Sequence, residues 1–128
     1  MAKSFRDMVA EGRAQAEVIT PQEAQTRMKD SKTLVIDVRE TDEAKANGMI
    51  PGAVSVPLGL LPLRADRDLP ESFRDARLQD RDTPVITTCG GGGQAALAAR
   101  TLKEMGFTKV SIIDGGTNGW KNAGLPTE

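Results

Sequence analysis

Cys89 is the only cysteine of the chain, and four consecutive glycines follow it. A cysteine thiolate is a strong nucleophile, and glycines let successive backbone N–H groups face one point, which forms a concave site for negative charge. Each glycine costs roughly 0.5–1 kcal/mol relative to alanine in a regular element, so the run indicates a function that offsets this cost. Cys89 is therefore the candidate nucleophile, and the expected anion-binding loop consists of Gly90, Gly91, Gly92, Gly93, Gln94 and Ala95.

The chain contains no histidine. Cys-His nucleophilic pairs, Ser-His-Asp triads and zinc sites built from cysteine and histidine are therefore excluded within it. A single cysteine also excludes an internal disulfide and a C-x-x-C redox pair. We expect neither a metal nor a cofactor. A helix N-terminus can favour a thiolate without an imidazole, because it presents unbonded N–H groups and the positive end of a dipole.

The elements around Cys89 support this interpretation. The apolar segment 85–88 predicts a strand that runs directly into Cys89, and residues 94–105 predict a helix after the glycine turn. Ligands of open parallel α/β sheets bind beyond the carboxyl ends of the strands, where Cys89 is expected. The structural alternative is a small buried cysteine that packs like alanine. Spacing alone does not separate the two interpretations, and the glycine run with its strand-turn-helix context favours the functional one.

The pattern along the chain alternates strands and helices, which predicts an α/β fold with an open parallel sheet of about five strands and helices on both faces. Thr20, Pro21 and Glu23 form a helix start with a capping box. Residues 1–16 are expected to form an N-terminal helical arm or extension, and residues 17–128 a single domain. The expected strands are 17–19, 34–38, 53–56, 85–88 and 110–113; the expected helices are 7–16, 21–29, 41–46, 94–105 and 117–122; and residues 64–82 are expected to be a charged loop with one short helix near 72–77.

Composition narrows the class of partner. The 128 residues carry a formal net charge of -1, which gives no basic surface for nucleic acid or an anionic membrane. No apolar stretch approaches the roughly 18 residues of a membrane span, and residues 1–16 lack the apolar run of a secretory signal. We expect a cytoplasmic protein with small-molecule partners, while the sequence gives no indication of its oligomeric state.

Several motifs together resemble a single-domain rhodanese, a member of the thiosulfate sulfurtransferase-like family. Each motif alone is weak, but their order and spacing fit the family over nearly the whole chain from Val18 onward. The matching segments are 34–40, 48–58, the loop 89–95, Gly106-Phe107, Gly115-Gly116, Trp120 and 124–126.

The resemblance implies a sulfurtransferase. It moves sulfane sulfur from thiosulfate or a persulfide to a thiol or cyanide, through a persulfide on Cys89. The implied partners are a small-molecule sulfur donor and a thiol acceptor, which can be carried by a protein. The resemblance also implies that Asp37, Arg39 and Trp120 are structural signature residues rather than catalytic ones.

Two positions depart from the family pattern. Met49 stands where the family usually has histidine, and the loop lacks the arginine or lysine that active loops often carry, with Gln94 at a position often held by a basic residue. Thiosulfate turnover is therefore expected to be weak, unless Arg64 or Arg67 reaches over the site. The absent cation also leaves open an alternative function: a persulfide carrier or a sulfur-sensing binding module without efficient turnover.

A cysteine phosphatase or arsenate reductase of the C-x5-R type is the nearest enzymatic competitor. That chemistry needs an arginine six residues after the cysteine to bind the oxyanion bidentately. Ala95 occupies this position, and the first arginine after Cys89 is Arg100. The sequence therefore argues against phosphoryl or arsenate chemistry.

Overall fold

The structure is a computed structural model that describes residues 2–128. Its centre is a five-stranded sheet with the strand order β1-β5-β4-β2-β3, in which every neighbouring pair is parallel. The strands are β1 (Glu17–Ile19), β2 (Leu34–Asp37), β3 (Val54–Ser55), β4 (Val85–Thr88) and β5 (Val110–Ile113). The expectation of an α/β fold with a five-stranded parallel sheet is confirmed.

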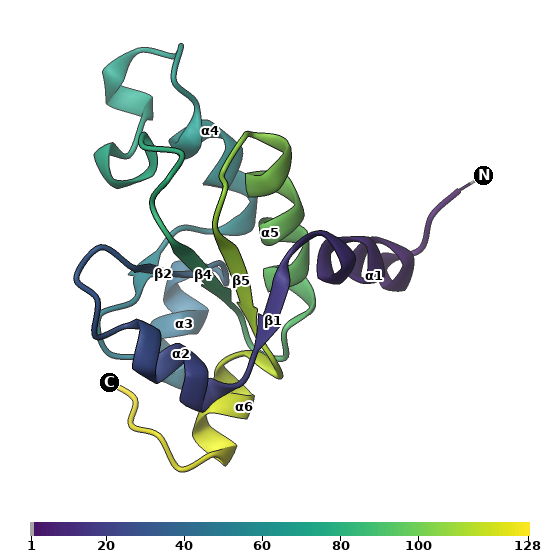
Figure 1. Cartoon of the computed structure of the whole chain (residues 1–128), viewed down its shortest axis with the longest axis vertical. Coiled ribbons are helices and arrows are strands. Elements are labelled where there is room, and N and C mark those ends of the chain that lie inside the picture. Colours follow the sequence, from purple (N-terminus) through teal and green to yellow (C-terminus); the bar gives the residue numbers. More distant parts are fainter. Residues whose placement is uncertain (1) are drawn as a thin grey trace.

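Helices cover both faces of this sheet (Figure 1). The α-helices are α1 (Phe5–Gln15), α2 (Pro21–Arg27), α3 (Thr41–Asn47), α4 (Leu61–Ala65), α5 (Gly93–Glu104) and α6 (Gly116–Asn122), and the short 3-10 helices are η1 (Leu58–Leu60), η2 (Glu71–Phe73) and η3 (Ala76–Leu78). The expected single helix near 72–77 is wrong, because Arg74 is extended and separates two 3-10 turns. Helix α1 also begins earlier than expected, since Ser4 and Asp7 form a capping box that fixes its start at Phe5.

The two faces of the sheet bury separate apolar clusters, because successive side chains of a strand point to opposite sides. One face packs Ile36, Val85 and Ile112 against α4 and α5. The other packs Val35 and Ile86 against α2 and α6. Burial on both sides explains why the strands read as continuous apolar runs in the sequence.

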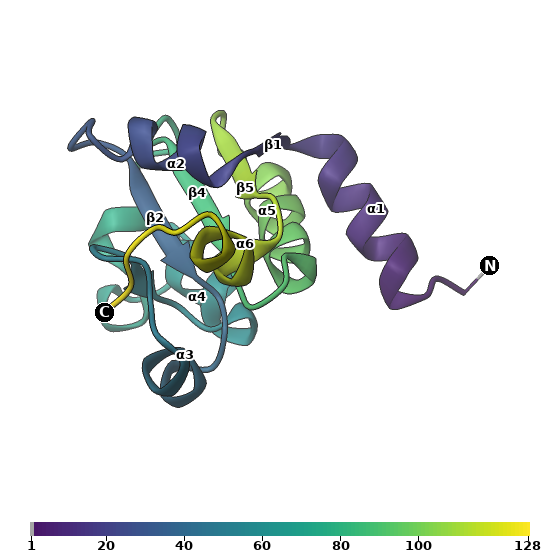
Figure 2. The same ribbon diagram turned by 90° about the horizontal axis from the view of Figure 1, so that it is seen from below.

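Helix α5 sits close to the sheet because it presents small side chains. Four alanines of α5 are fully buried: Ala95, Ala96, Ala98 and Ala99. The outer side of α5 is in turn covered by α1, which lies beyond the sheet edge and extends away from the body toward the N-terminus (Figures 1 and 2). The first turn of α5 is therefore held between the sheet on one side and α1 on the other.

Parallel strands bring their carboxyl ends to one edge of the sheet. At this edge β2 and β4 end in register at Asp37 and Thr88, and β5 ends next to them at Ile113. The segments that leave these three ends, starting at Val38, Cys89 and Asp114, surround the candidate site.

Candidate active site

Cys89 follows β4 directly, and its side chain is buried, with 1% of the residue exposed. Its Sγ accepts hydrogen bonds from the backbone N–H groups of Gly92, at 3.0 Å, and Ala95, at 3.4 Å. Both donors belong to the start of α5, for which Gly92 is the N-cap. Unbonded backbone N–H groups at the start of a helix are donors that can stabilise negative charge placed near them. The geometry therefore places two such donors against the sulfur of Cys89.

The loop between Cys89 and α5 curls around the sulfur because of one backbone angle. Gly92 has a φ of 104°, in the region that side-chain-bearing residues rarely adopt. This turn brings the N–H groups of Gly92 and Ala95 toward the same atom. At Gly90 and Gly91, by contrast, no heavy atom lies within 4 Å of the position that a Cβ would occupy. Gly90 and Gly91 therefore border open space.

The start of α6 supports the loop from behind. The N–H of Thr117 donates to the carbonyl of Cys89 at 2.8 Å, and the N–H of Asn118 donates to the carbonyl of Gly90 at 3.0 Å. Gly116 makes this approach possible, because a Cβ there would lie 2.8 Å from both carbonyl oxygens. The sequence motif Gly115-Gly116 was expected as a family signature, but its role as the support of the cysteine loop appears only in three dimensions.

Asp37 and Arg39 form a buried bidentate ion pair beside the cysteine. Arg39 Nε lies 3.0 Å from Asp37 Oδ1, and Arg39 Nη2 lies 2.7 Å from Asp37 Oδ2. The same Nη2 donates to the carbonyl of Gly48 at 3.0 Å, which ties the end of β2 to the turn after α3. Hydrogen bonding to Asp37 raises the pKa of Arg39, burial opposes this, and the charges of Asp37, Glu43 and Cys89 raise it further. The buried pair thus ties the end of β2 to the turn after α3, and the charge of Cys89 is among those that act on Arg39.

The remaining expected residues lie elsewhere or play structural roles. Gln94 is exposed on α5, and Trp120 is buried with its Nε1 donating to the carbonyl of Pro126 at 2.7 Å. Arg64 donates to the carbonyl of Phe73, and Arg67 donates to that of Gln79. Both guanidinium groups are thus bonded to carbonyls of the loop 66–82. Neither donates a hydrogen bond to the cysteine loop in the part of the chain that the structure describes.

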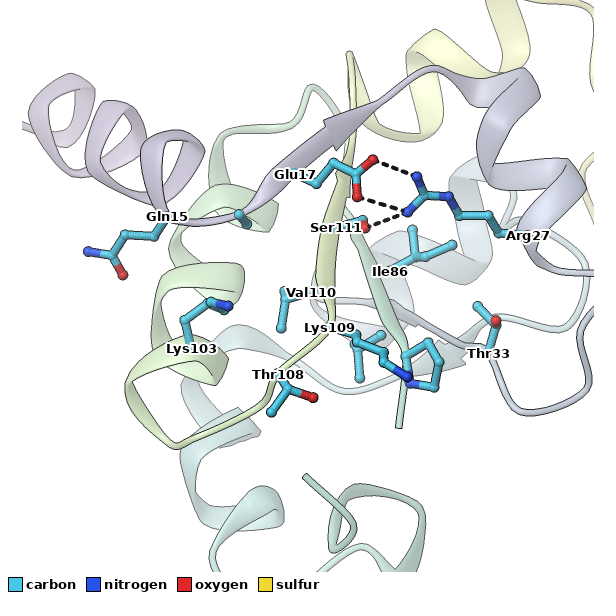
Figure 3. A pocket seen from close by; sticks show the side chains of 13 residues that line it. Gln15, Glu17, Arg27, Thr33, Ile86, Lys103, Thr108, Lys109, Val110 and Ser111 are labelled. Carbon is cyan, nitrogen blue, oxygen red and sulfur yellow. Dashed lines mark hydrogen bonds and ion pairs between the residues drawn. The ribbon is translucent and has the colours of Figure 1, made fainter. Parts of the chain in front are cut away.

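A separate cavity of about 350 Å³ lies at the opposite, amino edge of the sheet (Figure 3). Its lining includes Glu17, Val85 and Val110, which are the first residues of β1, β4 and β5. Arg27 bonds Glu17 and the hydroxyl of Ser111 across its rim. Because Cys89 follows the far end of β4, this cavity is not the approach to the nucleophile.

Within residues 2–128 no three His, Cys, Asp or Glu side chains are grouped so that they could hold a metal ion. Likewise, none of the described helices is both long and apolar enough to cross a membrane.

The fold and the site define an α/β domain whose single cysteine lies at the carboxyl edge of a parallel sheet, in a backbone cradle formed by the N–H groups of Gly92 and Ala95. A sequence model of the rhodanese-like domain matches residues 20–123. The chain therefore belongs to the rhodanese-like domain family, as the resemblance indicated.

Named relatives agree with this assignment. The chain is 30% identical to a putative thiosulfate sulfurtransferase of Synechococcus elongatus, over 91% of this chain and 40% of the relative. It is 32% identical to a thiosulfate sulfurtransferase of Glaesserella parasuis, over 86% of this chain and 91% of the relative. The chain thus spans about two fifths of the first relative and most of the second.

Among solved structures, a Rhodopseudomonas palustris protein of unknown function matches with a TM-score of 0.90 and 30% identity, covering 100% of this chain and 96% of the other. That protein is described as a possible tyrosine phosphatase. In the present chain the position six residues after the cysteine is Ala95, which offers a backbone N–H to the sulfur and no guanidinium. The residues here do not supply the bidentate oxyanion clamp of that chemistry.

Proposed function

We propose that the protein is a sulfurtransferase that moves sulfane sulfur from thiosulfate or a persulfide to a thiol or cyanide through a persulfide on Cys89. The observation that carries the proposal is the pair of backbone N–H groups, from Gly92 and Ala95, that point at the buried Sγ. Membership of a family whose relatives are named sulfurtransferases supports the same reaction class.

The reaction proceeds in two displacements, as in other covalent catalysis. The Cys89 thiolate attacks the outer sulfur of thiosulfate, a new S–S bond forms, and the old S–S bond breaks with its electron pair leaving on sulfite. An acceptor thiolate or cyanide then attacks the outer sulfur of the Cys89 persulfide. The sulfur leaves as an acceptor persulfide or thiocyanate, and the Cys89 thiolate is regenerated, so no external oxidant or reductant is needed.

The depth of the sulfur limits the donors that fit. With 1% of Cys89 exposed, a donor must present a terminal sulfur on a slender group. Thiosulfate and persulfides both meet this requirement.

Substitution of the nucleophile tests the proposal. Wild-type protein is expected to form thiocyanate from thiosulfate and cyanide, and Cys89→Ser is expected to abolish this, because serine is not a comparable nucleophile without a general base. Intact mass of the wild type after donor alone is expected to show one added sulfur. Thiocyanate formation that survives in Cys89→Ser would contradict the mechanism.

The persulfide carrier remains the second candidate because the loop 90–94 offers no side-chain cation. Backbone donors can stabilise a persulfide that has formed, whereas a guanidinium or ammonium would also attract a dianionic donor from solution. A donor panel separates the two functions. Stoichiometric sulfur on Cys89 with negligible steady-state thiocyanate favours the carrier, and sustained turnover favours the enzyme.

A further inference from the structure

Helix α1 lies outside the family match, which begins at residue 20, yet it contacts the helix that carries the cysteine cradle. The two helices cross with their backbones close together at Gly12. A Cβ at Gly12 would lie 2.1 Å from the carbonyl oxygen of Ala96, so only glycine permits this approach. Helix α1 is therefore seated on the first half of α5 at a fixed position.

Phe5, at the N-terminal end of α1, contacts the backbone of the cradle at Gly93. A Cβ added to Gly93 would lie 2.8 Å from Cζ of Phe5 and 3.7 Å from Cγ2 of Val9. Gly93 stands in the chain between Gly92 and Ala95, the two residues whose N–H groups point at Sγ. The phenylalanine ring thus rests on the outer side of the turn that aims both donors.

Ion pairs hold α1 in this position. Glu11 of α1 pairs with Arg100 of α5 at 2.8 Å and with Lys3 at 2.6 Å. The side chain of Arg100 is 27% exposed, because α1 packs against this side of α5. A further pair, at 3.6 Å, links Arg13 to Asp114, the residue before the turn at Gly115-Gly116. Ion pairs therefore tie α1 both to α5 and to the segment that leads into α6.

We propose that α1 is part of the active site and that Phe5 is a positioning residue for Cys89: its ring fixes Gly93, and Gly93 fixes the N–H groups of Gly92 and Ala95. This proposal is tested by two measurements, and only the second, sulfur-transfer turnover, rests on the proposed function. The ring is 55% exposed, so its burial contributes little to global stability and its removal leaves the body of the fold intact. The effect is expected on the chemistry of the sulfur rather than on folding.

The test compares Phe5→Ala with Phe73→Ala, a control at another exposed phenylalanine, 44% exposed, on η2. The first readout is the pH profile of Cys89 alkylation by iodoacetamide, which needs no sulfur transfer. Phe5→Ala is expected to change this profile, because the N–H groups that contact Sγ are no longer held in place by the ring. Phe73→Ala is expected to match the wild type, and an unchanged profile in Phe5→Ala would overturn the proposal.

The second readout is thiosulfate turnover. Phe5→Ala is expected to lower kcat with little change in KM, by on the order of tenfold, since a misplacement of about 1 Å can cost roughly a hundredfold. Phe5→Leu, which restores part of the contact, is expected to recover part of kcat. An equal kcat in wild type and Phe5→Ala would contradict the proposal. If the wild type transfers no sulfur while the alkylation profile still shifts, the proposed function fails and the positioning role stands.

A double-mutant cycle addresses the contact directly. Gly93→Ala is expected to displace the ring of Phe5, because the added methyl collides with it. Its effect on alkylation should therefore be smaller in the Phe5→Ala background than in the wild type. Additive effects of the two substitutions would show that the ring and Gly93 act independently, which would overturn the inference.

Discussion

The four glycines after Cys89 have different physical reasons to be glycine. Gly92 needs its φ of 104°, and Gly93 leaves room for the ring of Phe5. Gly90 and Gly91 face open space and have no positive φ, so no steric requirement for glycine exists there among the described residues. The run that looked uniform in the sequence thus divides into one turn residue, one contact residue and two residues that border open space.

Gly116 allows a direct test of how the back of the cradle supports the cysteine. Alanine there must bear a φ of 62° and a contact of 2.8 Å with the carbonyls of Cys89 and Gly90. Gly52→Ala is the matched control, because Gly52 has a φ of 83° and nothing within 4 Å of the added methyl. We expect Gly52→Ala to cost only backbone strain, about 1–3 kcal/mol by thermal unfolding, with normal sulfur transfer. Gly116→Ala should lose more stability and most of its activity. Equal losses in both variants would mean that the carbonyl contacts do not matter.

At the scale of elements, patterns that are local in sequence were sufficient to predict most of the fold. The buried strands β2, β4 and β5 are short apolar runs, and Thr20 with Glu23 forms the capping box that starts α2. The site was predicted where a strand, a glycine turn and a helix follow one another in the chain. The elements that support the site were not predicted. Helix α1 packs on Gly93 and α6 bonds the carbonyl of Cys89 from the other end of the sequence, and neither contact leaves a periodic signal.

Two arginines near the loop 66–82 were candidates for the cysteine site because of their charge, but their side chains bond to nearby backbone carbonyls. Arg64 and Arg67 were hypothesised to reach over the cysteine, and their guanidinium groups donate to carbonyls of Phe73 and Gln79. We expect the double substitution Arg64→Ala and Arg67→Ala to lower the melting temperature while the KM for thiosulfate stays unchanged, because the lost bonds hold the loop. Steady-state kinetics beside a thermal melt checks this. A raised KM at unchanged stability would support the original hypothesis instead.

At the scale of the whole molecule, ion pairs fasten segments that share little apolar surface. Hydrogen bonding to Lys3 lowers the pKa of Glu11, burial opposes this, and the charges of Lys3 and Arg100 lower it further. Hydrogen bonding to Arg27 lowers the pKa of Glu17, and hydrogen bonding to Arg77 lowers that of Asp75. The Arg100–Glu11 pair connects α5 to α1, the Arg27–Glu17 pair connects α2 to β1, and the Arg77–Asp75 pair lies within one turn, whereas Lys3 and Glu11 both belong to the N-terminal segment. For each of these groups, folding favours the ionised carboxylate over the protonated carboxyl group.

A lowered carboxyl pKa determines the direction in which folding stability changes with pH. The stabilisation is complete above the unfolded-state pKa, near 4 for these groups, and is lost as the pH falls through the lower folded-state pKa. We therefore expect α1 to loosen from α5 in mild acid before the sheet unfolds, since its contacts with the body include few large apolar side chains. Amide NMR signals of Val9 and Gly12 should shift below about pH 4 while those of Ile86 and Ile112 stay constant. Glu11→Gln, which cannot ionise, should show the loosened signals already at pH 7 and no acid step at α1. Simultaneous loss of all these signals in the wild type would contradict the expectation that α1 is released before the rest of the fold.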